Sequence, residues 1–294
     1  MVVATGFFDG VHLGHREVIG QLVASAKARG EESAVITFWP HPRMVLRKDA
    51  RGLRLLSSLT EKKEMLLSLG VDRVEVLDFT REFAALTMEA FLREYVMGLC
   101  SGTAVLLGYD NRMGSDCSSP EDLVAVASSL GLDVIKAPLV SSNAGYAVSS
   151  TKIRTALEVG DMEQAAAMLG YDYSLYGVVV AGNRLGRTLG FPTANMSLYE
   201  PLKLVPSDGV YLVRVETAGK QRYGMCNIGV KPTVGTTNSR TIETNIFDFD
   251  EEIYGLPIRL TFLRKIRDER RFADLRELSI QLALDKESCL SIIG

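Results

Sequence analysis

Cysteine is scarce in this sequence: the 294 residues contain four, and no two of them have C-x-x-C spacing. The length excludes a small scaffold held together by disulfides, so we expect free thiols in a reducing compartment. No apolar run approaches the roughly 18 residues of a membrane span. The apolar run at 2–5 is also far too short for the core of a signal peptide. We therefore expect a cytoplasmic protein without a membrane partner.

A block of basic charge is also missing. Lysine and arginine number 33 against 36 aspartate and glutamate residues, which gives a net charge of -3. Three stretches are locally basic, at 47–51, 61–63 and 263–271, but acidic residues are interleaved in each, and we expect all three to be solvated surface. Nothing here indicates binding to nucleic acid or to an anionic membrane. We expect the partners to be small molecules.

Strand and helix patterns alternate over the first 150 residues. Short apolar runs typical of buried strands stand at 2–5, 33–38, 73–79, 103–108 and 133–138. Helical patterns lie between them at 13–29, 59–70, 87–99 and 120–131. This alternation predicts βαβ units and an α/β domain with a parallel sheet.

The pattern changes after about residue 172. Five strand-like runs follow, with turn residues but no helix between them, at 174–182, 209–217, 222–230, 240–249 and 257–266. They predict a small antiparallel β-barrel, closed by a helix at 273–290. Two short helices joined at Gly160–Asp161 are predicted in the intervening stretch. We therefore predict domains at 1–155 and 173–294, with a helical linker at 156–172.

Histidine is rarer than cysteine, yet two of the three histidines share one turn: His12 and His15, beside Gly10 and Gly14. The turn follows the first strand and opens the first helix, at the edge of a parallel sheet where ligands bind. Free N–H groups at a helix start attract phosphate, and histidine can donate to phosphate oxygens, more strongly when protonated. The pattern favours a site for nucleotide phosphates. A pair of metal ligands and an ordinary turn are the alternatives.

The segment VSSTKIRTAL predicts a second anion-binding helix start. Ser149, Ser150 and Thr151 can each cap the helix. Lys152 and Arg154 stand in its first turn, where cations oppose the helix dipole unless an anion binds there. The alternative is a capped helix whose cations are exposed to solvent.

The motif GRTLGFPTAN surrounds Thr193 and Asn195 with glycines and a proline. A glycine-rich loop can wrap phosphates with its N–H groups, and these two side chains offer oxygen atoms suited to Mg²⁺. If TIETNIF is a strand, Glu243 shares one face with Thr241 and Asn245. A carboxylate aimed at the loop could accept a hydroxyl proton in phosphoryl transfer. The alternatives are a tight turn between strands and an exposed carboxylate.

Taken together, GFFDGVHLGHREVI, TFWPHP and the later SSTKIR resemble the nucleotidylyltransferase superfamily. More narrowly, they resemble the bacterial bifunctional riboflavin kinase/FAD synthetase family. The second half is similar to riboflavin kinase throughout, in YSLYGVVVAGNRLGRTLGFPTANM, GVYLVRV, NIGVKPTVG and FLRKIRDERR. The resemblance implies a Rossmann-like nucleotidylyltransferase domain followed by a riboflavin kinase-like barrel. It also implies ATP, riboflavin, FMN and FAD as substrates or products, with Mg²⁺ as cofactor.

In the first domain, the resemblance implies that His12 and His15 hold the phosphates of ATP during adenylyl transfer to FMN. Arg154, with the serines and threonine before it, would bind the departing pyrophosphate. The other binding residues that it implies are Gly6, Phe7, Asp9, Gly10, Gly14, Asp110, Ser149, Ser150 and Thr151. Of these, we expect Asp9 to be structural.

In the second domain, the resemblance implies that Glu243 is the catalytic base for the 5′-hydroxyl of riboflavin. Thr193 and Asn195 would bind Mg²⁺ together with ATP. Further residues along the nucleotide would be Gly182, Arg187, Gly190 and Pro192.

Three places depart from the pattern of the family. In YDNRMG, Asn111 and Met113 replace aromatic residues, and SDCSSPED at 115–122 stands where the family has a basic, glycine-rich piece. Asn245 stands where the family often has histidine, in our expectation without touching the chemistry. Three other functions therefore stay open. The chain could be a riboflavin kinase whose first domain only binds nucleotide, a non-enzymatic flavin or nucleotide sensor, or an enzyme that adenylylates another phosphate ester.

Overall fold

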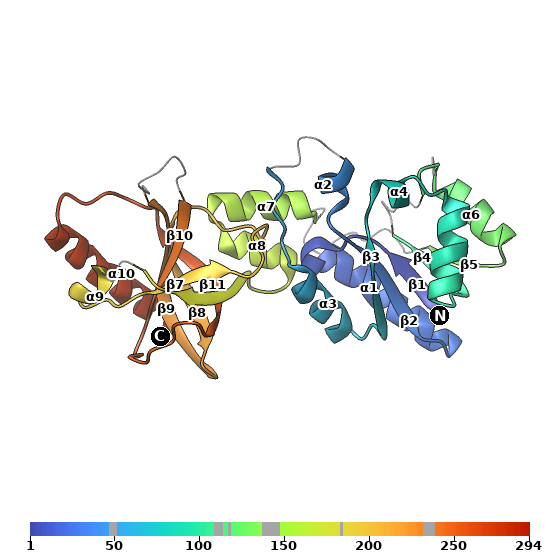
Figure 1. Cartoon of the computed structure of the whole chain (residues 1–294). Coiled ribbons are helices and arrows are strands. Elements are labelled where there is room, and N and C mark those ends of the chain that lie inside the picture. The colour runs from blue at the N-terminus through green and yellow to red at the C-terminus, as the bar shows by residue number, and fades with distance from the viewer. Residues whose placement is uncertain (47–51, 109–113, 117–118, 137–147, 183–184, 232–238) are drawn as a thin grey trace. The chain divides into compact units, whose positions relative to one another are not determined.

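The computed structural model describes residues 1–46, 52–108, 114–116, 119–136, 148–182, 185–231 and 239–294 (Figure 1). Contacts within the chain divide it into two compact units, Met1–Ser150 and Thr151–Gly294. The first unit contains a parallel sheet with helices packed on it, and the second contains a closed antiparallel barrel followed by a long helix. The predicted fold class is therefore confirmed.

The sheet of the first unit is parallel, with the strand order β3-β2-β1-β4-β5. The strands are β1 (Val2–Thr5), β2 (Ser33–Trp39), β3 (Arg73–Asp78), β4 (Ala104–Leu107) and β5 (Asp133–Lys136). Both β1 and β4 are buried along their whole length, as expected for central strands of a sheet that is covered on both faces. The last two residues predicted for the fifth strand lie outside the described residues.

Helices cover both faces of this sheet. They are η1 (Asp9–Val11), α1 (Leu13–Arg29), α2 (Pro42–Leu46), α3 (Leu59–Ser68), α4 (Arg81–Ala84), α5 (Met88–Phe91), the π-helix η3 (Leu92–Leu99) and α6 (Pro120–Ser129). Alternate residues of β1 enter different cores, because successive side chains of a strand point to opposite faces. Val3 packs with the layer of α5, η3 and α6, whereas Val2 and Ala4 pack with α1 and α3.

The second unit is built around a closed barrel with the strand order β10-β7-β6-β11-β8-β9. Its strands are β6 (Ser174–Val180), β7 (Ala194–Leu198), β8 (Gly209–Thr217), β9 (Lys220–Lys231), β10 (Ser239–Ile246) and β11 (Pro257–Arg267). Its helices are α7 (Ser150–Val159), α8 (Met162–Leu169), α9 (Leu185–Thr188) and α10 (Leu275–Ile293). The predicted break between α7 and α8 is confirmed: Gly160 has a φ of 82°, and Asp161 caps α8.

One strand of the barrel was missing from the prediction. β7 begins in the last two residues of the GRTLGFPTAN motif, which the sequence suggested was a glycine-rich loop, and it separates β6 from β10 in the barrel. With five residues and a mixed polar sequence, ANMSL, it carries too little alternation to be recognised as a strand. The barrel therefore has one more strand than predicted, and that strand carries Asn195.

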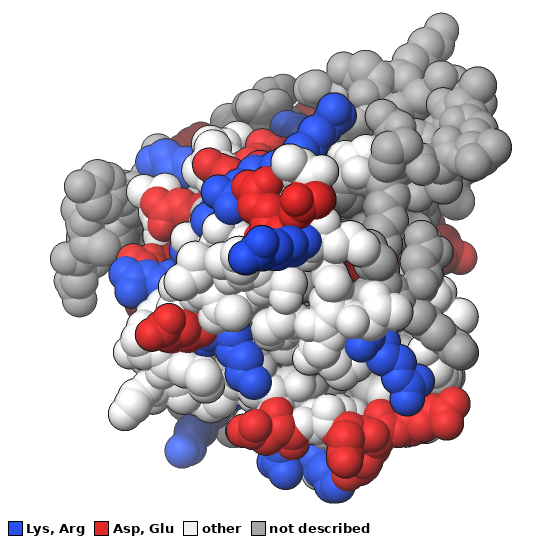
Figure 2. All heavy atoms as spheres, turned by 90° about the vertical axis from the view of Figure 1, so that its left-hand side faces the viewer, with Lys and Arg blue, Asp and Glu red and all other residues white. Residues whose placement is uncertain are grey.

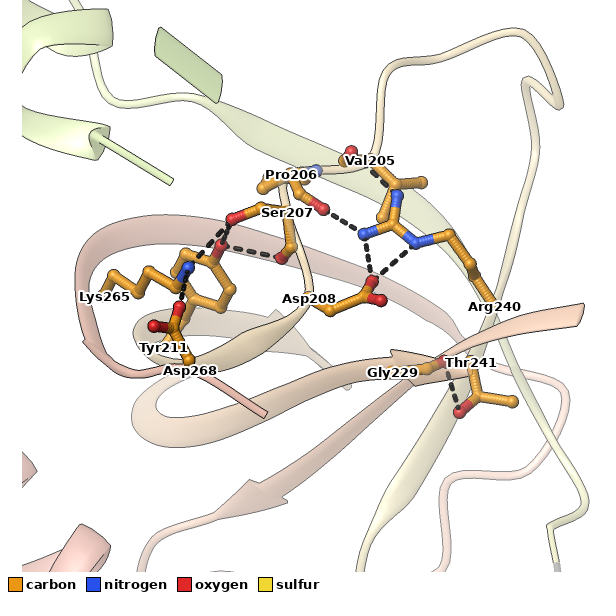
Figure 3. Close-up of polar contacts among 10 residues, drawn as sticks. All are labelled: Val205, Pro206, Ser207, Asp208, Tyr211, Gly229, Arg240, Thr241, Lys265 and Asp268. Carbon is orange, nitrogen blue, oxygen red and sulfur yellow. Dashed lines mark hydrogen bonds and ion pairs between the residues drawn. The ribbon is translucent and has the colours of Figure 1, made fainter. Parts of the chain in front are cut away.

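A network of side chains anchors the start of β10 (Figure 3). The Arg240 guanidinium contacts Asp208 at 2.6 Å and donates hydrogen bonds to the carbonyl oxygens of Val205 and Pro206. Beside it, Tyr211 donates to the carbonyl oxygen of Ser207 at 2.7 Å. These bonds hold the segment before β8 against β10, three residues before Glu243.

The basic stretch at 263–271 forms ion pairs rather than a basic patch. Its pairs are Arg264–Glu163, Lys265–Asp268, Arg267–Asp285 and Arg270–Glu277. Figure 2 views the molecule from the side of α10, and basic and acidic side chains lie beside one another over the described residues in view. The expectation of a solvated stretch is wrong for Arg267, because its partner Asp285 is only 1% exposed and joins α10 to β11.

The described cysteines are free thiols in buried positions: Cys100, Cys226 and Cys289. Burial raises the pKa of the Cys226 and Cys289 thiols to about 12. Both groups therefore stay protonated near neutral pH and act as small apolar side chains. Cys117 lies outside the described residues.

Candidate functional site

The histidine turn lies at the carboxyl end of β1. Phe8, Gly10 and Val11 all have positive φ angles, which reverse the chain between β1 and α1. The His12 side chain caps α1: its Nδ1 accepts a hydrogen bond from the backbone N–H of His15 at 3.3 Å. Because Nδ1 is the acceptor, neutral His12 carries its proton on Nε2, where it can be donated.

The two imidazoles lie face to face. The His12 and His15 rings are 3.6 Å apart between centroids, with planes inclined by 14°. The edge of Phe8 closes the other side of His15 at 5.3 Å. The structure thus brings the two predicted phosphate ligands together at a helix start, where backbone N–H groups also favour an anion.

The buried side chain of Asp9 fixes the histidine turn to a neighbouring segment of the chain. Its side chain is 4% exposed and accepts hydrogen bonds from the backbone N–H groups of Leu56 at 3.0 Å and Ser57 at 3.1 Å. The Ser57 hydroxyl in turn accepts from the N–H of Gly10 at 3.0 Å. These bonds tie the turn to the segment before α3, which is what a structural role for Asp9 requires.

A buried lysine under the turn was not predicted. Lys62 is 1% exposed, and its Nζ donates to the carbonyl oxygens of Phe7 at 2.9 Å and Phe38 at 3.5 Å. The ammonium also lies 3.9 Å from the centroid of the Phe7 ring. Burial lowers the pKa of Lys62 to about 8, although the charge of Asp9 acts in the opposite direction. The expectation that 61–63 is solvated surface is therefore wrong for Lys62.

The sequence did contain a signal for Lys62. The residue lies three and four positions before Met65 and Leu66, on the face of α3 that packs into the core. A lysine on an apolar helix face is an exception to the rule that charged side chains stay at the surface. Here the ends of β1 and β2 offer carbonyl oxygens that compensate the buried charge in part.

His15 is neutral near pH 7. Burial lowers its pKa well below the ordinary value, and the charges of His12 and Lys62 lower it further. The Nδ1 atom of His15 is buried and has no hydrogen-bond partner among the residues that the structure describes. His15 therefore offers polar nitrogen atoms rather than a full charge, and the buried cation in this region is Lys62.

The other predicted residues of the first domain lie as follows. The Ser150 hydroxyl donates to the carbonyl oxygen of Asp9 at 3.2 Å, which joins the start of α7 to the histidine turn. The Phe7 ring lies 4.1 Å from the His41 ring of the TFWPHP motif. Gly6 leaves room for the Phe8 ring, since a Cβ there would lie 2.9 Å from it.

Gly14 lies in the first turn of α1, and Ser149 is half-buried directly before α7. Thr151 and Arg154 follow in α7 and belong to the second compact unit. The predicted Asp110, with the substituted Asn111 and Met113, lies outside the described residues.

In the barrel, β7 lies between β6 and β10 and aligns the predicted kinase residues. Asn195 is paired with Glu243 on one side and with Val180 on the other. The Thr193 hydroxyl donates to Oε2 of Glu243 at 3.5 Å. Three oxygen-bearing side chains, a hydroxyl, an amide and a carboxylate, are thus gathered at one corner of the barrel.

Close packing requires glycine at two positions of this corner, Gly182 and Gly186, and a positive φ favours it at Gly190. A Cβ at Gly182 would lie 2.2 Å from Nδ2 of Asn195, so only glycine leaves space for that amide. Gly186 accepts a hydrogen bond from the N–H of Phe191 at 2.8 Å, and Gly190 has a φ of 82°. Arg187 on α9 and Pro192 are exposed. The loop is therefore a tight structure folded back on β7.

The oxygen atoms at this corner suit Mg²⁺. Hydroxyl, amide and carboxylate oxygens are the ligands that this ion takes, and it commonly takes its other ligands from water and substrate phosphates. Within the described ranges, no group of three or more histidine, cysteine, aspartate or glutamate side chains could hold a metal ion. The residues present at this corner fit Mg²⁺ through their oxygen atoms.

Comparison with known families matches each unit to one model. Residues 1–152 match the FAD synthetase model, and residues 169–293 match the riboflavin kinase model. The bifunctional riboflavin kinase/FMN adenylyltransferase of Bacillus subtilis is 38% identical over 98% of this chain and 91% of its own length. The chain belongs to this bifunctional family. The relative of the same description from Escherichia coli K12 is 34% identical over 100% of this chain and 93% of its own length.

A solved structure supports the fold of the family member. It is described as a macrolide-efflux protein from Streptococcus pneumoniae and is similar with a TM-score of 0.89 and 33% identity, over 97% of this chain and 92% of that one. In the part of the chain that our structure describes, no helix has both the length and the apolar character needed to cross a bilayer.

Proposed function

We propose that this chain makes FAD from riboflavin in two reactions, each using one ATP. In the second unit riboflavin is phosphorylated to FMN, and in the first unit FMN is adenylylated to FAD with release of pyrophosphate. The observation that carries the proposal is the pairing of Glu243 with Asn195 on neighbouring strands of the barrel, with Thr193 directly before β7 and in contact with Glu243. The paired histidines at the carboxyl end of β1 support the second reaction.

In the kinase reaction, Glu243 accepts the proton of the riboflavin 5′-hydroxyl. The hydroxyl oxygen then forms a bond to the γ-phosphorus of ATP, the bond from that phosphorus to the bridging oxygen breaks, and ADP leaves. Thr193 and Asn195 hold the phosphates, and N–H groups of the loop around Gly190 offset their charge. Bound Mg²⁺ would be held by Thr193 and Asn195 and would supply neutralisation of phosphate charge.

In the adenylyl transfer, an oxygen of the FMN phosphate attacks the α-phosphorus of ATP, and the bond to the β-phosphate breaks. The attacking phosphate is already an anion, so no general base is required, and positioning carries the step. The Nε2–H of His12 and the ring of neutral His15 donate to phosphate oxygens. Ser149, Ser150, Thr151 and Arg154 would receive the pyrophosphate, as the resemblance implies.

The test is incubation with riboflavin and MgATP, with riboflavin, FMN and FAD separated over time. Glu243→Gln should abolish FMN formation and spare the conversion of supplied FMN to FAD. His15→Ala should slow FAD formation and leave FMN formation intact. Equal loss of FMN formation from riboflavin and of FAD formation from supplied FMN in either variant would contradict two separate sites. FMN without FAD from the unchanged protein would leave only the kinase.

We also propose that the enzyme works in the cytoplasm with small-molecule partners. The three described cysteines are unpaired, as a reducing compartment requires. ATP and free flavins are small molecules. Fractionation of cells followed by assay of FMN and FAD formation in each fraction tests the location.

A further inference from the structure

Asn245 makes a contact that its place in the sequence did not suggest. It lies on β10 two residues after Glu243, and the two side chains point to the same face of the strand. Asn245 is 6% exposed, and its Nδ2 donates to the carbonyl oxygen of Pro192 at 2.7 Å. Pro192 directly precedes Thr193, whose hydroxyl reaches Glu243.

The bond stands where the backbone ladder between β7 and β10 stops. The two strands pair at Glu243–Asn195 and Thr244–Ala194, and the next pair in this register would be Asn245–Thr193. Pro192, one residue further along, has no N–H to continue the ladder. Just beyond the last backbone pair, the side chain of Asn245 donates to the Pro192 carbonyl and so adds a bond between β10 and the segment that leads into β7.

We propose that Asn245 is a positioning residue for phosphoryl transfer, which rests on the proposed kinase function. By fixing the carbonyl of Pro192, the amide fixes the direction in which the chain enters Thr193 and Asn195. The Thr193 hydroxyl is thereby held 3.5 Å from the Glu243 carboxylate. Asn245 touches neither substrate, and it sets the geometry of the corner that receives MgATP.

Two variants remove the donor and keep the number of heavy atoms in the side chain. Asn245→Asp places an acceptor against the Pro192 carbonyl, and Asn245→Leu leaves that carbonyl without a partner. In each we expect kcat/KM for MgATP in FMN formation to fall about ten-fold or more, the effect of one lost hydrogen bond in a reacting complex. KM for riboflavin should change less than two-fold, because the flavin does not meet this residue. Asn245→His should restore most of the activity, since an imidazole N–H can donate to the same carbonyl.

Thr241→Val is the matched control. Its hydroxyl also donates from β10 to a backbone carbonyl, that of Gly229 at 3.5 Å, on the same face but away from the corner (Figure 3). FMN formation by this variant should be unchanged. FAD formation from supplied FMN should be unchanged in all four variants, because it takes place in the first unit. The melting temperature of the second unit reports that the barrel of each variant is folded.

The outcomes separate the two proposals. If the unchanged protein makes no FMN, the kinase function itself fails. If it makes FMN and the Asp and Leu variants keep the kcat/KM for MgATP, the positioning role of Asn245 is refuted. The positioning role is also refuted if kcat/KM for MgATP, kcat/KM for riboflavin and the melting temperature all fall together, because that pattern indicates a purely structural residue. Selective loss for MgATP with rescue by histidine supports the proposal.

Discussion

Replacing Lys62 by methionine tests how the first unit carries a buried positive charge. An ordinary lysine has a pKa of 10.5, and burial lowers that of Lys62 to about 8. Between these two values the unfolded chain binds a proton that the folded chain has released, so the stability of the first unit rises with pH across this window. Below pH 8 both states are protonated and the whole cost of burial is present. The difference between the two pKa values corresponds to about 3 kcal/mol.

Methionine has a similar length and no charge, so the variant lacks the pH-dependent cost of burying an ammonium group. We expect the free energy of unfolding of the unchanged protein, relative to that of Lys62→Met, to rise by about 3 kcal/mol between pH 7.5 and pH 10.5. At pH 7 the variant loses the bond to the Phe7 carbonyl, which offsets about 1.5–3 kcal/mol of the gain from removing the buried charge. The variant should therefore be about as stable as the unchanged protein at pH 7.

The assay is urea unfolding followed by tryptophan fluorescence. Trp39 is the single tryptophan of the chain and lies on β2, so its signal reports the first unit alone. Lys63→Met, at the exposed neighbouring position, is the control. Its free energy of unfolding, relative to that of the unchanged protein, should not depend on pH in this range. A difference between Lys62→Met and the unchanged protein that stays constant from pH 7 to pH 10.5 would refute the reasoning.

Three further results are expected. Gly182→Ala should raise KM for MgATP in FMN formation about ten-fold with little change in melting temperature, because its Cβ would displace the Asn195 amide. Asp285→Ala should destabilise the second unit by about 3 kcal/mol, since it leaves the guanidinium of Arg267 unpaired between α10 and β11. The pKa of His15 is depressed in the folded state, so the unfolded chain binds more protons below pH 6.5 and stability falls there. His15→Gln should lack this loss between pH 7 and pH 5, measured by the fluorescence of the first unit.

Each of these results has a nearby control. Ala181→Ser, next to Gly182 and exposed, should leave KM unchanged, and equal effects of both changes would contradict the packing argument. Glu287→Ala, on the exposed side of α10, should change the stability of the second unit little. Amide hydrogen exchange in α10 is measured for both variants, and it should be faster in Asp285→Ala than in Glu287→Ala. His41→Gln should keep the acid-induced loss; if it removes the loss instead, the titrating group is not His15.

The sequence predicted what depends on local pattern. The buried run VVAT, the glycines and the two histidines place a donor-rich turn after the first strand, and the structure has it there. The pairing of Glu243 with Asn195 was not predictable, because it depends on β7, a strand too short and polar to be recognised. Which residues of β7 pair with β10 depends on the hydrophobic pattern and turns of the whole barrel, and the five residues of β7 alone do not determine it.

Lys62 and Asn245 show the other limit. The interleaved charges suggested a solvated lysine, and the resemblance gave Asn245 no part in the chemistry. Each is instead buried and bonded to carbonyl oxygens that become available only once distant strands have come together. The sequence signal in such cases is a polar residue on an otherwise apolar face. It shows which side chain is buried, but not which carbonyl oxygen accepts its hydrogen bond.

The closed barrel is joined unevenly around its circumference. β10 pairs with β9 through eight residue pairs, from Ser239–Lys231 to Ile246–Gly224, but with β7 through only two. The seam between β7 and β10 is therefore where the barrel would open first, and Thr193, Asn195 and Glu243 sit along it. A nucleotide bound by residues on both sides of this seam would add contacts between β7 and β10 and would therefore make the barrel harder to open there.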